Sequence, residues 1–251
     1  VSGDFYWFQE IDPRHDLYET RRELKSRRNE SLPKNPSLSF RYNKFAISAV
    51  DCTGHGVPGA FISMLGYHIL DHIIESGITK PEMILKELHA EIRKTLRQEK
   101  TNNQEGMDMA LCIINKTENL VEFAGARNHL YYIRNGKVEQ AKADRASIGG
   151  TIEKEQKKGV KQFTRQTIEI KEPTWFYMMS DGYSDQFGGE NKEKFTKGKL
   201  KKLLYEIHQK PSAEQKNILE QRFEKWKNGF GRQLDDVTII GFKINPVFHL
   251  Q

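Results

Sequence analysis

Three aspartates far apart in the sequence each lie at one end of an apolar run, and this recurrence is the strongest constraint on the fold. The aspartates are Asp51, Asp181 and Asp235, and the runs cover 46–50, 175–180 and 237–240. Each run has the length and the β-branched or aromatic content of a strand. An aspartate beside a turn often caps backbone N–H groups, so each one alone fits a turn as well as a functional site. Three such strand-end carboxylates suggest one shared site.

The first of these aspartates lies in the most informative stretch of the chain. The run that ends at Asp51 is followed by a turn containing Gly54 and Gly56, and then by Pro58. Because proline is favoured in the first turn of a helix, the stretch reads as strand, glycine-rich turn and helix. This order places the carboxylate of Asp51 at an exposed strand tip.

Three carboxylates in one site repel one another and raise one another's pKa unless a cation balances their charge. Carboxylate oxygens are good ligands for hard divalent ions such as Mg²⁺ and Mn²⁺. Cys52 and Cys112 are the only cysteines, and they lack the clustered spacing of a zinc site. The residues therefore favour a magnesium or manganese site with few protein ligands and several waters.

The rest of the chain reads as many strands and two pairs of helices. Strands are expected at 1–11, 44–51, 107–115, 119–125, 129–134, 137–142, 161–170, 174–180 and 236–244. Helices are expected at 58–76, 81–99, 197–208 and 212–226. Asn135 and Gly136 predict a type I′ hairpin turn. The basic segment 13–43, which contains three prolines, is expected to be a surface insertion.

Length and composition indicate one domain that covers residues 1–251. The formal net charge is +6, but the basic runs lack the interleaved aromatics of a nucleic-acid platform, so no nucleic-acid partner is expected. No apolar run approaches the length of a membrane span, and a cytoplasmic location is expected. Because the sequence starts without Met and inside an expected strand, we expect a C-terminal fragment of a longer regulatory protein. Its upstream sensor region could anchor the full protein to a membrane.

Six short motifs, taken in order, resemble those of one family. They are Val1–Tyr6, Asp51–Gly56, Gly106–Cys112, Phe123–His129, Ser180–Gly182 and Asp235–Thr238. In this order they resemble the metal-dependent serine/threonine phosphatases of the PPM (protein phosphatase 2C-like) family, and specifically its bacterial SpoIIE-type branch. The resemblance implies an α+β fold, a four-layer α-β-β-α sandwich of two mainly antiparallel sheets flanked by helix pairs.

The resemblance also implies a site with two divalent metal ions, Mn²⁺ or Mg²⁺. Asp51 would bridge the ions, the backbone carbonyl of Cys52 would complete one, and Asp181 and Asp235 would hold the other. Asp4 matches the carboxylate of the first motif and would act through water or from the second shell. A water activated by the metals would then attack phosphorus in line, without a phosphoenzyme intermediate.

Further residues are candidates for supporting roles. Asp108 lies in an apolar strand, so it either supports the site or makes an unrelated structural contact. Asp236 should point away from Asp235, because strand residues alternate. His55 stands four residues after Asp51 rather than two as in eukaryotic relatives, so the role of general acid does not transfer to it. Asn128, or its neighbour Arg127, is a candidate for contact with phosphate.

The resemblance implies hydrolysis of phosphoserine or phosphothreonine on a bacterial regulatory protein, such as an anti-sigma-factor antagonist. A homodimer is an option that the residues leave open. One alternative is a catalytically silent module that keeps the fold and binds a signalling partner. The retained carboxylates argue against it, because a structural domain gains nothing from gathering unpaired charges. A metal-dependent hydrolase of small phosphoesters is a third reading.

Overall fold

The computed structural model describes residues 3–12, 44–54, 56–101, 103–150, 163–228 and 231–247. Two of the sequence predictions lie outside the described residues: the surface insertion at 13–43 and the position of His55.

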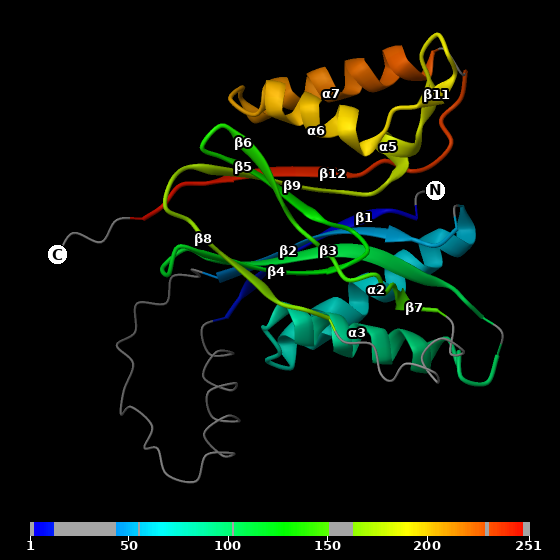
Figure 1. Ribbon diagram of the computed structural model, residues 1–251. Coiled ribbons are helices and arrows are strands. Elements are labelled where there is room, and N and C mark those ends of the chain that lie inside the picture. The colour runs from blue at the N-terminus through cyan, green and yellow to red at the C-terminus, as the bar shows by residue number, and fades with distance from the viewer. Residues whose placement is uncertain are drawn as a thin grey trace.

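The described residues form four layers, which confirms the predicted α-β-β-α sandwich (Figure 1). Two antiparallel sheets face each other across a buried apolar layer. One pair of helices covers the outer face of the first sheet, and a second pair covers the outer face of the second sheet. Each sheet is therefore apolar on both faces, which explains why the central strands read as nearly continuous apolar runs.

The first sheet carries the N-terminal strands. Its order is β1 (Phe5–Ile11), β2 (Lys44–Cys52), β3 (Gly106–Asn115), β4 (Leu120–Ala126) and β8 (Gln166–Glu169), with β7 (Ile148–Gly149) paired to β3. All of these pairings are antiparallel. The register sets Asp51 directly opposite Asp108 on the neighbouring strand.

The second sheet is built from later parts of the chain. Its order is β12 (Ile239–Ile244), β9 (Thr174–Met179), β5 (Leu130–Arg134) and β6 (Lys137–Ala141). A two-stranded ribbon, β10 (Phe187–Gly188) with β11 (Glu193–Lys194), follows β9 in the chain. The turn between β5 and β6 has positive φ at both Asn135 (48°) and Gly136 (64°), as a type I′ turn requires, which confirms that prediction.

Within the described ranges, four long helices and one short helix complete the fold. They are α2 (Val57–Glu75), α3 (Pro81–Thr95), α5 (Gly182–Asp185), α6 (Lys197–Ile207) and α7 (Ser212–Lys227). Proline stands in the first turn of both α2 and α3, where its missing N–H costs nothing. α3 ends at Thr95, earlier than the predicted end at residue 99.

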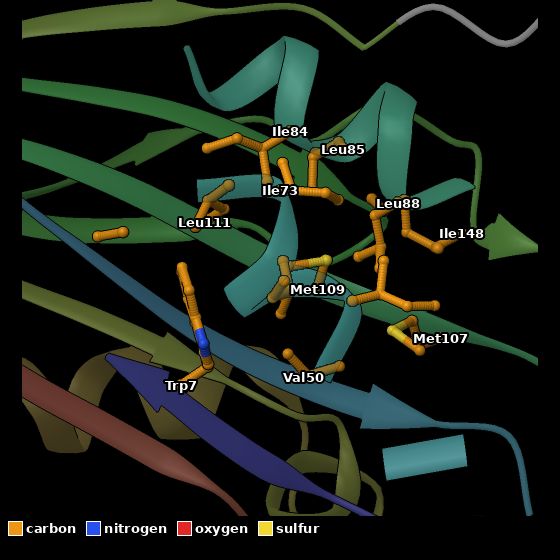
Figure 2. Close-up of a cluster of buried hydrophobic side chains, with 14 of the residues drawn as sticks. Trp7, Val50, Ile73, Ile84, Leu85, Leu88, Met107, Met109, Leu111 and Ile148 are labelled. Atoms are coloured by element: carbon orange, nitrogen blue, oxygen red, sulfur yellow. The ribbon is translucent and has the colours of Figure 1, made fainter. Parts of the chain in front are cut away.

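The apolar core between the first sheet and its helices fixes the positions of the strands (Figure 2). Met107, Met109 and Leu111 project from β3 toward Leu85 and Leu88 of α3. Trp7 of β1 is fully buried, and its indole N–H donates a hydrogen bond to Asp71 of α2 at 2.7 Å. This packing holds β1 against α2 and β3 against α3, and the pairing of β1 with β2 brings Asp4 beside the end of β2.

In the part of the chain that the structure describes, one helix, α2, is long and apolar enough to cross a membrane by length and mean hydropathy alone. The prediction that no apolar stretch reaches that length is therefore wrong by these measures. In the structure α2 packs against the first sheet through Ile62, Ile69, Leu70 and Ile73. A core helix passes the same test, so the finding is weak evidence for a membrane span.

Candidate metal centre

The structure brings three of the predicted carboxylates to one place, between the two sheets. Asp51 lies near the end of β2, and Asp181 is the second residue after the end of β9. Asp235 precedes β12, which runs antiparallel to β9 with Ile239 opposite Met179, so it lies at the same edge as Asp181. The backbone N–H of Asp181 donates a hydrogen bond to a carboxylate oxygen of Asp51 at 3.5 Å. The site therefore joins the two sheets.

Asp4 completes the group from the first strand. It directly precedes β1, whose Phe5 pairs with Val50, so Asp4 lies beside the end of β2. The side chains of Ser180 and Thr238 hydrogen-bond the carboxylate of Asp4. Ser180 lies in the motif that contains Asp181, and Thr238 lies in the motif that contains Asp235. Asp4 is therefore held by the same two segments that carry these aspartates.

Burial and neighbouring carboxylates shift the pKa of three aspartates at this site. Burial, followed by the charges of Asp4 and Asp181, raises the pKa of Asp51 to about 8. Burial, with the charges of Asp236 and Asp235, raises the pKa of Asp4 to about 6. Burial also raises the pKa of Asp181. Such shifts are expected where carboxylates gather without a cation to balance them.

The loop before β12 places a fifth carboxylate at the site. Asp236 accepts a hydrogen bond from the backbone N–H of Gly3 at 2.7 Å. Both Asp235 and Asp236 raise the pKa of Asp4, so both lie near it. The argument from strand alternation does not apply to Asp236, because the strand starts only at Ile239.

The supporting candidates have distinct surroundings. Asp108 lies 3.6 Å from the guanidinium Nε of Arg127, and its charge also raises the pKa of Asp51 and of Asp181. Asp108 therefore has an ion-pair partner and also lies near the other carboxylates. Asn128 is 8% exposed and lines a small depression together with Asp181 and Lys197. His55 is not among the described residues.

The donor chemistry fits hard divalent ions. The donors are carboxylates, and burial raises the pKa of the Cys52 thiol to about 12, so that thiol is not an anionic ligand. Among the described residues, no group of three or more His, Cys, Asp or Glu side chains is arranged to hold a metal ion. A site here must rely on few side chains and on carbonyl or water oxygens, as Mg²⁺ usually does.

The sequence did not predict the individual roles of some residues of this site. Ser180 and Thr238 stand beside predicted aspartates, but hydroxyl residues are too common for their position to indicate a role. Gly182 carried a usable signal, since it follows Asp181 directly. A Cβ at Gly182 would lie 2.0 Å from the carbonyl oxygen of Asp236, so only glycine lets the two segments approach this closely.

Comparison with known proteins identifies the family. The model of the family described as Stage II sporulation protein E (SpoIIE) matches residues 42–245. The chain belongs to the SpoIIE family. Together with the fold, this makes it a SpoIIE-type member of the PPM (PP2C-like) phosphatases. Among curated proteins, no sequence matches the chain.

Three solved structures have a similar fold. The SiaA-PP2C domain of Pseudomonas aeruginosa is 27% identical, with a TM-score of 0.75 over 98% of this chain and 82% of that one. The PP2C phosphatase domain of SpoIIE from Bacillus subtilis, solved with a fragment of its regulatory domain, is 16% identical. Its TM-score is 0.64 over 96% of this chain and 58% of that chain. RsbX, solved in complex with magnesium, is 11% identical, with a TM-score of 0.53 over 96% of this chain and 86% of that one.

The raised pKa values predict how stability depends on pH in the absence of metal. The ordinary value for an aspartate is 3.8, so between about pH 4 and pH 8 the folded chain keeps protons that the unfolded chain has lost. We expect the melting temperature of the EDTA-treated protein to fall as pH rises through this window. Mn²⁺ should restore stability most strongly near pH 8. Thermal unfolding from pH 5 to pH 9 measures this dependence. A melting temperature that does not change with pH in the absence of metal would contradict the raised pKa values of these aspartates.

Proposed function

We propose that this chain is a Mn²⁺- or Mg²⁺-dependent protein serine/threonine phosphatase. The observation that carries the proposal is the convergence of Asp4, Asp51, Asp181 and Asp235 where the two sheets meet. The raised pKa values of Asp4, Asp51 and Asp181 are typical of a functional site where a divalent cation could bind. Membership of a family of PP2C-like phosphatases supports this reading of the site.

The proposed metal ligands would come from both sheets. Asp51 from the first sheet and Asp181 from the second would hold the ions, with Asp235 and the carbonyl of Cys52 as further ligands. When bound, the ions supply the positive charge that activates a water and balances the phosphate oxygens. Asp4 would orient waters at the site, because Ser180 and Thr238 hold its carboxylate in place.

The proposed substrate is a phosphoserine or phosphothreonine on a bacterial regulatory protein. Neighbouring structures support this class of substrate: one is a bacterial serine phosphatase, and another contains the RsbU and RsbW domains of Rv1364c from Mycobacterium tuberculosis. A third is described as part of the bacterial stressosome. An anti-sigma-factor antagonist remains our proposed example of such a substrate.

The test combines metal binding with substrate comparison. Calorimetry would measure Mn²⁺ binding to the wild-type chain, and the same samples would be assayed on a phosphoserine peptide and on a nucleotide. We expect Mn²⁺ binding and a clear preference for the peptide. Faster turnover of the nucleotide would favour a small-phosphoester hydrolase. A folded protein that binds no divalent ion and hydrolyses neither substrate would favour the catalytically silent binding module.

A further inference from the structure

A depression beside the carboxylates has the composition of an anion subsite. It lies between the end of β9 and the start of α6, and Asn128, Ser180, Asp181, Ser184 and Lys197 are among its lining residues. Its volume is about 10 Å³, roughly the room that one water-sized oxygen needs. Because Asp181 is one of the proposed metal ligands, an oxygen placed here would lie next to the proposed metal centre.

Asn128 offers this depression a hydrogen-bond donor. Its side-chain Nδ2 is buried and has no hydrogen-bond partner among the described residues. A buried donor without an acceptor is costly, so such a group commonly marks a bound water or ligand. The preceding residue, Arg127, has a φ of 59°, in the left-handed region that non-glycine residues rarely adopt. The strained turn at Arg127 therefore fixes the direction in which Asn128 leaves β4.

Lys197 brings positive charge to the same depression. It is the first residue of α6, where the aligned peptide dipoles add further positive potential. The helix start is fixed by its N-cap, because the hydroxyl of Thr196 accepts a hydrogen bond from the N–H of Lys199. A cation beside an amide donor, in a space for one oxygen, suits an anionic oxygen better than a neutral one.

We propose that Asn128 and Lys197 bind a phosphate oxygen of the phosphoserine substrate. The amide of Asn128 donates a hydrogen bond to that oxygen, and the ammonium group of Lys197 offsets its charge. The phosphate is then held from one side by the proposed metal centre and from the other by these two residues. The assignment rests on the proposed function and adds to it the residues that select a phosphate dianion.

Inorganic phosphate is the probe for this subsite, because it is the product of the proposed reaction and needs no knowledge of the natural substrate. Asn128→Ala and Lys197→Gln would be compared with wild type for phosphate inhibition of peptide hydrolysis, for KM, and for Mn²⁺ binding by calorimetry. We expect the inhibition constant of phosphate and the KM to rise about 10-fold in each variant, with Mn²⁺ affinity unchanged. Lys197 is exposed, so its replacement leaves the core intact.

The matched control is Lys202→Gln, which removes the same charge from the same helix. Lys202 lines a separate groove with Glu206 and Trp226, so its loss should leave phosphate inhibition unchanged. Wild-type phosphate inhibition in both test variants would overturn the assignment. So would an Asn128→Ala variant that only melts earlier, since the depression would then hold a structural water. If wild type neither binds Mn²⁺ nor hydrolyses the peptide, the proposed function fails, and this assignment fails with it.

Discussion

Replacement of Asp51 by Asn is expected to lower phosphopeptide hydrolysis by more than about 100-fold and to weaken Mn²⁺ binding. Changes to residues that merely support a metal ligand cost about 10- to 100-fold, so loss of Asp51, which would itself hold a metal ion, should cost more. Without metal, the same variant should be more stable than wild type at pH 8, because it removes the most strongly shifted buried carboxylate. Steady-state kinetics, calorimetry and thermal unfolding in EDTA would measure the three effects.

The control for this variant is Asp71→Asn. Asp71 lies on α2, away from the gathered carboxylates, and accepts the indole N–H of Trp7 at 2.7 Å. Asparagine keeps an oxygen acceptor there while removing the same charge, so activity and Mn²⁺ affinity should stay near wild type. Equal losses in both variants would mean that Asp51 acts through general stability or net charge, and the metal-centre reading would be wrong.

Replacement of Gly182 by Ala is expected to have the second large effect, on stability and on Mn²⁺ binding. The added methyl carbon would lie 2.0 Å from the carbonyl oxygen of Asp236 and 3.3 Å from a methyl carbon of Val237. Both obstacles belong to the segment that carries Asp235, so that segment must move away from Asp181. We expect a loss of about 3 kcal/mol or more in the free energy of unfolding, together with weaker Mn²⁺ binding. Urea titration and calorimetry would measure the two.

Gly198→Ala is the matched control for Gly182→Ala, because the added carbon at position 198 would enter open space. The nearest atom to its added carbon is the Thr196 hydroxyl at 3.9 Å, and the residue lies within α6. Alanine in a helix is favoured over glycine by roughly 0.5–1 kcal/mol, so this variant should gain stability. If Gly182→Ala unfolds at the same urea concentration as wild type, the close approach of the two segments does not constrain the site.

Most of the fold could be predicted because its long elements carry strong local patterns. The apolar runs of β2, β3 and β9 and the stripes of α2 and α3 appear in the sequence at nearly their observed bounds. Four short elements were not predicted: α5, β7, β10 and β11. With two to four residues each, they are too short to show any period, and tertiary contacts alone decide their conformation.

The candidate site, like the fold, could be predicted only in part. Asp51 and Asp181 could be placed together because each ends a recognisable strand, and the structure joins them by a hydrogen bond. The direction of Asp236 could not be predicted from strand alternation, because β12 starts three residues later than the predicted position 236. Lys197 gave no signal, since it stands among many lysines, and only the packing of α6 brings it beside Asp181.

The hydrogen bond between Gly3 and Asp236 spans 233 positions of the chain. Ribosomes build a protein from its N-terminus, so Asp4 and Asp51 emerge long before the segment that accompanies them in the folded state. During synthesis their carboxylates have neither Asp181 nor Asp235 beside them. The centre described here can therefore form only after residue 236 has left the ribosome, and a prematurely terminated chain would carry only the carboxylates of its N-terminal half.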